Sequence, residues 1–184
     1  MPPIRSQETF SSFGKTILED EFTTDFTIRC ETNEFRVHKA VLCARSPVLR
    51  ASIHTPMLEA SKGEIFVKDI GEKALGTVIK FIYTGELELG EDPDIEDLSL
   101  LGTMYLLPGF MDLLALRLQM WKEEFSGEMI ADIVIAAHRH ESEYLREIAM
   151  DKIRGNKKIF NDPGFRNGMK DADPSIMIDL FKDL

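Results

Sequence analysis

In the first third of the chain, the apolar residues are spaced first with the period of a helix and then with the alternation of strands. Phe10, Phe13 and Ile17 recur at i, i+3 and i+7 among polar residues, which predicts a short amphipathic helix. In residues 26–37, apolar and polar side chains alternate on both sides of the turn sequence ETNE, which predicts two strands joined as a hairpin. The apolar side of so short a helix needs a partner to pack against.

The pattern then becomes helical and returns once to a strand. Two short helices are expected after the hairpin, and the second should start at Ser46-Pro47, because serine accepts free N–H groups and proline suits the first helical turn. Residues 65–67, all apolar, predict a third, buried strand. The apolar stripe in residues 75–82 predicts a helix that Gly85 ends in a left-handed conformation.

The remaining residues carry helical spacing only. Residues 98–120 predict an αα-hairpin broken by a Pro-Gly pair, and residues 130–153 predict two paired helices. The sequence NDPGFRNG (161–168) is typical of a turn-rich break, after which Asp173 should cap a last helix. Because the strand-like segments occupy only the first third, we predict an α+β fold with an all-α C-terminal extension.

Composition and charge narrow the function classes. With 184 residues, 43% of them hydrophobic, the chain can bury one substantial core or two small ones. Its 32 acidic and 22 basic residues give a net charge of -10, which repels a phosphate backbone, so we expect no direct nucleic-acid partner. No run of about 18 apolar residues could span a bilayer, and the start lacks the apolar stretch of a signal peptide. We expect an intracellular protein of the nucleus, the cytoplasm or both, with no membrane partner and with reduced cysteines.

The stretch EFRVHKAVLCARSPVL (34–49) gathers side chains from which nucleophilic active sites are often built. His38 and Lys39 stand at the predicted junction of strand and helix. Cys43 lies on an apolar helical stretch, and Ser46 caps the next helix. A nucleophile, its base and an orienting group must converge on one reacting atom, and these positions do not favour convergence. We therefore interpret the four residues as architectural and predict no catalytic residue, no cofactor and no enzymatic activity.

Two further patterns bear on metal binding. His138 and His140 are two residues apart, which places them on different sides of a helix, and no cysteine lies nearby. The acidic run GELELGEDPDIED (85–97) lacks the ligand spacing of an EF-hand, so a solvated loop is the simplest interpretation and weak calcium binding the alternative. We predict no metal site.

Three separated blocks, DFTIRCETNEFRVHKAVLCARSPVL, MLEASKGEIFVKDI and IKFIYTGEL, occur in an order typical of one family. They resemble the BTB/POZ domain, in which a strand that begins with aspartate leads to F-x-x-H-K, an apolar helix, A-R-S-P and later F-I-Y-T-G. The resemblance implies a helical cluster capped by a small, roughly three-stranded sheet. Asp25, His38 and Lys39 resemble the charged pocket of transcriptional BTB proteins, but we expect them to stabilise the fold instead, with Lys39 paired to Asp25. The matching positions that we expect to stabilise this fold are Asp25, His38, Lys39, Ser46, Pro47, Tyr83 and Gly85.

The resemblance covers residues 10–122, which follow a tail of residues 1–9. Residues 123–184 resemble the short helical extension, a BACK or three-box region, of the speckle-type POZ proteins. Members of that group carry a substrate-binding MATH domain ahead of the BTB/POZ domain, and residues 1–9 leave no room for one. The chain is therefore expected to be either a fragment or a stand-alone form.

The resemblance also implies a partner. Met57, Leu58 and Glu59 fit the hydrophobic-x-Glu pattern through which many BTB domains bind cullin-3, the scaffold of a ubiquitin ligase. An apolar side chain on a loop can anchor in a partner's pocket. The alternative is that Met57 only fills a gap in the core. The helices in residues 130–153 would extend the cullin contact, although a plain helical core explains the same stripes.

Phe10, Phe13, Ile17 and Val41 lie where related domains form a two-fold dimer contact, so the resemblance implies a homodimer. The alternative is that the amphipathic helix packs only on its own domain. The leading function is then a homodimerising adaptor that binds cullin-3 and brings an unidentified protein substrate to ubiquitination. The rival is a self-association module that scaffolds transcriptional or other complexes without binding a cullin.

Overall fold

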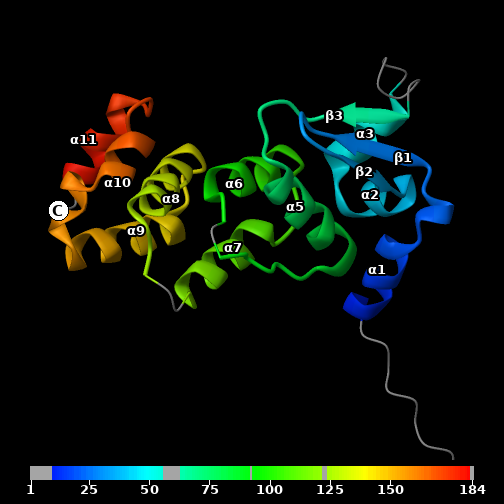
Figure 1. Cartoon of the computed structure of the whole chain (residues 1–184), viewed down its shortest axis with the longest axis horizontal. Helices are drawn as coiled ribbons and strands as arrows, with labels where there is room; N and C mark the ends of the chain where they lie inside the picture. Colours follow the sequence, from blue (N-terminus) through cyan, green and yellow to red (C-terminus); the bar gives the residue numbers. More distant parts are fainter. Residues whose placement is uncertain (1–9, 56–62, 92, 122–123, 183–184) are drawn as a thin grey trace, which may run out of the picture. The chain divides into compact units, whose positions relative to one another are not determined.

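The computed structural model describes residues 10–55, 63–91, 93–121 and 124–182 (Figure 1). The chain divides into two compact units, each with its own core. The first unit comprises residues 1–88 and 104–108, and the second comprises residues 89–103 and 109–184. The predicted division into a BTB/POZ domain and an extension concerns evolutionary domains and stays a prediction.

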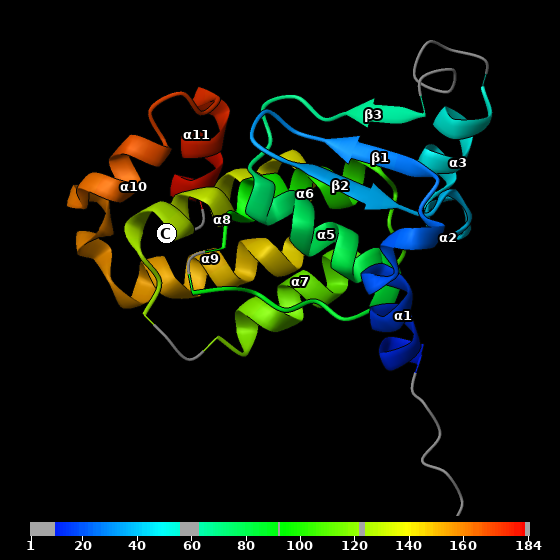
Figure 2. The ribbon, with the colours of Figure 1, turned by 45° about the vertical axis from the view of Figure 1, so that its right-hand side comes forward.

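The first unit combines a small sheet with a helical cluster, as predicted. The sheet has the order β2-β1-β3, which Figure 2 shows with β1 in the middle. Strands β1 and β2 form the predicted hairpin, with Phe26 opposite Val37, and β3 runs parallel to β1. The elements are α1 (Phe10–Glu19), η1 (Glu21–Thr23), β1 (Phe26–Arg29), β2 (Glu34–Val37), α2 (Lys39–Arg45), α3 (Pro47–His54), β3 (Glu64–Phe66) and α5 (Glu72–Thr84).

The third strand forms where the sequence predicts it, but the prediction that it is buried is wrong. The Phe66 side chain is 56% exposed and that of Ile65 is half-buried. The reason is that successive side chains of a strand point to opposite faces of the sheet: Ile65 pairs with the buried Ile28, whereas Phe66 pairs with the exposed Arg29. The apolar Val67, which follows the strand, is buried and donates its N–H to the Arg29 carbonyl at 2.7 Å.

The core of the first unit lies between the sheet and its helices. Helix α5 supplies much of it and ends as the sequence predicts: Gly85 has a φ of 72° and donates its N–H to the Phe81 carbonyl at 2.8 Å. A side chain would strain this left-handed position. The large side chains that are almost completely buried here include Ile28, Leu42, Leu49, Leu75, Ile82 and Tyr83.

The second unit contains only helical elements among its described residues. Helices α8 and α9 pack against each other as the predicted pair, and α9 also contacts α7. None of the helices in the described part of the chain is long and apolar enough to cross a bilayer. The elements are α6 (Ile95–Met104), α7 (Phe110–Gln119), α8 (Gly127–Arg139), α9 (Glu143–Gly155), η2 (Lys157–Asn161), α10 (Pro163–Gly168) and α11 (Pro174–Lys182).

The sequence predicts a turn-rich break over residues 161–168, and that prediction is wrong for most of the segment, because Pro163–Gly168 form a short helix, α10. The Asp162 carboxylate accepts the Phe165 backbone N–H at 3.0 Å, and Pro163 occupies the first turn. The Phe165 side chain is only 2% exposed, and α10 packs against α8. A cap and one buried aromatic side chain therefore outweigh the low helix propensity of the glycine and asparagine residues.

The predicted α+β class is confirmed, because the chain combines a three-stranded sheet with helices.

Candidate functional site

Helix α1 packs against the C-terminal end of α5, and a glycine allows this close approach. A Cβ atom at position 14 would lie 2.2 Å from the carbonyl oxygen of Tyr83 and 2.8 Å from its carbonyl carbon. Gly14 itself is buried. Because the atoms it would meet belong to backbone, only glycine fits here without moving a helix. One side of α1 is thus fixed to its own domain.

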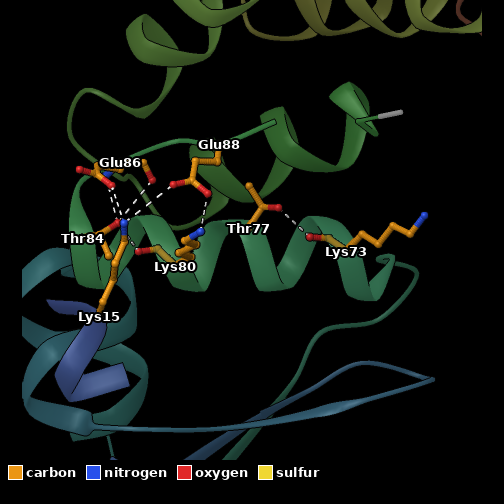
Figure 3. Close-up of polar contacts among 7 residues, drawn as sticks. All are labelled: Lys15, Lys73, Thr77, Lys80, Thr84, Glu86 and Glu88. Carbon is orange, nitrogen blue, oxygen red and sulfur yellow. Dashed lines mark hydrogen bonds and ion pairs between the residues drawn. The ribbon is translucent and has the colours of Figure 1, made fainter. Parts of the chain in front are cut away.

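Ion pairs flank this contact (Figure 3). The ammonium group of Lys15 on α1 lies 3.2 Å from a Glu86 carboxylate oxygen and 3.9 Å from one of Glu88, and Glu88 also pairs with Lys80 on α5. Hydrogen bonds from Ser11 and Lys15 lower the pKa of Glu86, and the one from Lys80 lowers that of Glu88. All of these side chains are well exposed, so each pair contributes little stability and mainly orients α1.

Two of the predicted dimer residues on α1, Phe10 and Ile17, are four and three residues from Gly14 and so lie beside it on the helix surface. Phe10 is 62% exposed and Phe13 is 53% exposed, while Ile17 is half-buried. Val41, the fourth residue of the set, is half-buried on α2 in the same unit. The structure therefore leaves two phenylalanines on the surface of a helix that is already anchored through Gly14. Their role in a dimer stays a prediction.

Tyr83 organises the junction between β2 and α2. Its hydroxyl oxygen lies 2.8 Å from both the backbone nitrogen and Nδ1 of His38, and His38 Nε2 lies 2.9 Å from the hydroxyl of Thr23. The Thr23 hydroxyl in turn donates to the Asp20 carboxylate at 2.8 Å. Burial raises the pKa of Tyr83, so its hydroxyl keeps its proton. His38 is thus fully occupied in a structural chain of hydrogen bonds.

This series of hydrogen bonds predicts which tautomer His38 adopts. The single hydroxyl hydrogen of Thr23 goes to Asp20, so Thr23 must accept from His38, which places a hydrogen on Nε2. Nδ1 then accepts from Tyr83, whose oxygen accepts the His38 backbone N–H. We expect the ¹⁵N chemical shifts of the ring to show a protonated Nε2 and an unprotonated Nδ1 at pH 8. A wild-type spectrum with the hydrogen on Nδ1 would contradict this hydrogen-bond direction. So would a wild-type spectrum with both forms equally populated, which is what we expect for the control Tyr83→Phe, because it lacks the hydroxyl group.

The other residues of the 34–49 stretch have separate partners. The backbone N–H of Lys39 donates to the Asp25 carboxylate at 2.8 Å, so the expected pairing of these two residues runs through the lysine backbone. The Lys39 ammonium instead lies 5.5 Å from the centre of the Phe26 ring, a cation–π contact. Cys43 contacts His54. These side chains do not converge on one point, as nucleophilic catalysis would require.

Ser46 performs the capping role that the sequence predicts. Its hydroxyl oxygen accepts the Leu49 N–H at 3.0 Å, and Pro47 occupies the first turn of α3. The same hydroxyl donates to the Tyr105 carbonyl at 2.6 Å. This second contact, which no local pattern could reveal, ties the segment 104–108 to the first unit.

The predicted cullin-binding residues Met57, Leu58 and Glu59 lie outside the described residues. The described chain stops after α3, at residue 55, and resumes at residue 63, just before β3. The three residues therefore belong to the connection between these two elements. Their role in binding stays a prediction.

The second unit contains an acid with a raised pKa that the sequence did not reveal. Asp132 on α8 is half-buried, and burial together with the nearby carboxylates raises its pKa to about 7. These carboxylates are Asp94, Glu96 and Asp97 around the start of α6, and Glu128 one turn earlier on α8. The apolar stripe of α8 was visible in the sequence, but the face that Asp132 occupies depends on where α6 packs. In the described residues, no group of three or more His, Cys, Asp or Glu side chains is arranged to hold a metal ion.

A cavity of about 400 Å³ between α8, α9 and α11 is lined by a histidine and an aspartate, and a serine of α11 lies beside them. Ser175 Oγ lies 3.4 Å from His138 Nε2, and His138 Nδ1 lies 3.6 Å from the Asp179 carboxylate. Both distances exceed the reach of about 2.6–3.2 Å that proton transfer needs. Asp179 is also held by Lys182 at 2.8 Å, and Asp173 accepts the Ser175 N–H. The group is a hydrogen-bond cluster at the start of α11.

Comparison with known proteins agrees with this fold. The BTB/POZ domain family model matches residues 15–119, more than half of the chain, so the protein belongs to the BTB/POZ family. Kelch-like protein 40a of Danio rerio is 29% identical over 103 residues, which cover 56% of this chain and 17% of that protein. TD and POZ domain-containing protein 4 of Mus musculus is 28% identical over 167 residues, which cover 90% of this chain and 44% of that protein.

Among solved structures, the chain is similar to the BTB domain of zebrafish PATZ1. The TM-score is 0.49 at 16% sequence identity, and the match covers 61% of this chain and 89% of that one. The chain spans less than half the length of the two curated relatives above.

Proposed function

We propose that this chain is a protein-interaction adaptor that forms a homodimer through α1. The observation that carries the proposal is the exposure of Phe10 and Phe13 on a helix that is fixed to α5 through Gly14. Two exposed aromatic side chains on an anchored helix offer a large apolar area, and burying such area drives association at about 25 cal/mol per Å². Membership of the BTB/POZ family supports an interaction role over an enzymatic one.

We further propose that the adaptor binds cullin-3 through Met57, Leu58 and Glu59, and so serves a ubiquitin ligase. Support comes from the hydrophobic-x-Glu pattern and from the position of these residues between α3 and β3. The match to TD and POZ domain-containing protein 4 extends over 90% of the chain, beyond the end of the family match. This supports a helical extension of the speckle-type kind, with a BACK or three-box region after the BTB/POZ domain.

Cullin binding is tested by titrating the chain with the N-terminal domain of cullin-3 in a calorimeter. We expect a dissociation constant in the micromolar range or tighter, and a loss of about tenfold or more in affinity for Met57→Ala and for Glu59→Ala, as anchoring residues show. Met104→Ala, which shortens another exposed methionine, is the matched control and should bind as the wild type does. Absence of binding at tens of micromolar would favour the rival, a scaffold that self-associates without a cullin.

The homodimer is tested by multi-angle light scattering at several protein concentrations. We expect a mass near twice the 20.9 kDa of one chain, and the monomer mass for Ile17→Asp, because a carboxylate would be buried in the apolar contact. Ile178→Asp, which alters an exposed isoleucine of α11, is the control for added charge. A wild-type mass of one chain at every concentration would refute the dimer.

A further inference from the structure

The cavity between α8, α9 and α11 has an apolar floor and a charged rim. Its volume of about 400 Å³ lies within the range of about 300–1,000 Å³ that is usual for ligand sites. The charged and polar side chains of the lining are at least partly exposed and form the rim. Such a cavity suits a ligand that has an apolar stem and a charged end. The floor consists of buried side chains from all three helices, Val134, Ala137, Ala149, Met150 and Ile176.

The rim carries more negative than positive charge. Three lining residues are acidic, namely Glu141, Glu143 and Asp179, and Arg146 adds a cation. The hydrogen bond from Lys182 lowers the pKa of Asp179, and the charge of Arg146 adds to this effect, so Asp179 already has cationic partners. Within the described parts of the chain, Glu141 and Glu143 form no ion pair. The rim is therefore negative where these two glutamates lie, and it attracts a cationic group.

Glu141 occupies a backbone conformation that is unfavourable for a glutamate. Its φ is 49°, in the left-handed region that glycine adopts far more readily. Two hydrogen bonds fix this turn between α8 and α9: the Glu141 N–H donates to the His138 carbonyl at 3.3 Å, and the Ser142 N–H donates to the Ala137 carbonyl at 2.9 Å. Strained residues of this kind cluster at binding sites, where the surrounding structure holds them in place. The turn thus keeps a carboxylate at the rim although glycine would suit its backbone better.

We propose that this cavity binds an arginine side chain of a partner protein. The alkyl stem lies on the apolar floor, as long cationic side chains bury their stems while their charged ends stay near water. The guanidinium group donates hydrogen bonds to the carboxylates of Glu141 and Glu143. Arginine is favoured over lysine because its planar group carries five donors in a fixed geometry and can bind two carboxylates at once. The site is separate from the proposed dimer and cullin contacts, so the proposal depends on neither.

The test titrates the full ¹⁵N-labelled chain with Nα-acetyl-arginine amide and follows the amide chemical shifts. We expect saturable shifts in the turn between α8 and α9, with a dissociation constant on the order of 1 mM, as suits a single side chain. Nα-acetyl-lysine amide should bind about fivefold more weakly, and Nα-acetyl-norleucine amide, which has the stem without the charge, should cause no saturable shift. Absence of saturable shifts in this turn with the arginine probe, or equal binding of the norleucine probe, would refute the proposal.

Substitutions at the rim separate binding from folding. Glu141→Gly should weaken binding of the arginine probe about fivefold and yet raise the urea midpoint of unfolding, because glycine removes the backbone strain. Glu143→Gln should weaken binding to a similar degree. Glu124→Gln, which neutralises an exposed glutamate of the second unit outside the cavity, is the matched control and should bind as the wild type does. Wild-type affinity in both Glu141→Gly and Glu143→Gln would overturn the role of the two carboxylates.

Discussion

Gly14→Ala is expected to lower the free energy of unfolding of the first unit by about 1–3 kcal/mol, the usual cost of forcing extra volume into a packed contact. The added Cβ would lie 2.2 Å from the Tyr83 carbonyl oxygen, and neither helix backbone can yield without losing contact. This steric cost outweighs the gain in helix propensity of up to about 1 kcal/mol that alanine brings to a helix interior. Denaturation by urea, followed by circular dichroism, measures the change.

Gly155→Ala is the matched control for this substitution. Gly155 also lies in a helix, at the end of α9, but no atom approaches the position of its missing Cβ within 4 Å. Alanine there should be neutral or stabilise the protein by up to about 1 kcal/mol. If Gly14→Ala behaved like Gly155→Ala, α1 would not be docked on α5 through this glycine in solution.

Asp132→Asn is expected to stabilise the second unit at pH 8 by about 1–2 kcal/mol. The shift of this pKa from 3.8 to about 7 corresponds to roughly 4 kcal/mol at full value, and we discount it because the carboxyl is partly exposed to solvent. Burial and the carboxylates of Asp94, Glu96 and Glu128 oppose the charged form in the folded state. Asparagine keeps the shape of the neutral acid and removes the charge.

The pH dependence of this effect has a definite sign. Between pH 4 and pH 7 the folded state keeps a proton on Asp132 that the unfolded chain has released, so the stability of the wild type falls as the pH rises through this window. The advantage of Asp132→Asn should therefore be close to zero at pH 4 and largest at pH 8. Unfolding curves at both pH values measure it, with Asp112→Asn, which neutralises an exposed aspartate, as the control. A pH-independent difference between Asp132→Asn and the wild type would contradict the assigned pKa.

Sequence patterns predicted the elements that depend on neighbouring residues. The cap at Ser46, the left-handed end of α5 at Gly85 and the hairpin of β1 and β2 all rest on local chemistry, and each forms as predicted. The break predicted at residues 161–168 failed because the decisive interaction, burial of Phe165 against α8, joins residues far apart in the sequence. The exposure of Phe66 depends likewise on its place opposite Arg29, on the exposed face of the sheet.

At the candidate site, too, the sequence predicted local structure but not contacts between residues far apart in the chain. The apolar spacing of Phe10, Phe13 and Ile17 indicated an amphipathic helix, but it could not tell which side of that helix would be covered. That choice is made by Gly14 and the end of α5, which are about 70 residues apart in the sequence and meet only in the fold. The proximity of Cys43 to His54, and of Asp132 to the start of α6, arises in the same way.

The segment 104–108 belongs to the first unit although the residues on both sides of it belong to the second. A fragment cut after residue 88 would lack the Tyr105 carbonyl and leave the Ser46 hydroxyl without its acceptor. No single cleavage or recombination point therefore separates the two units cleanly.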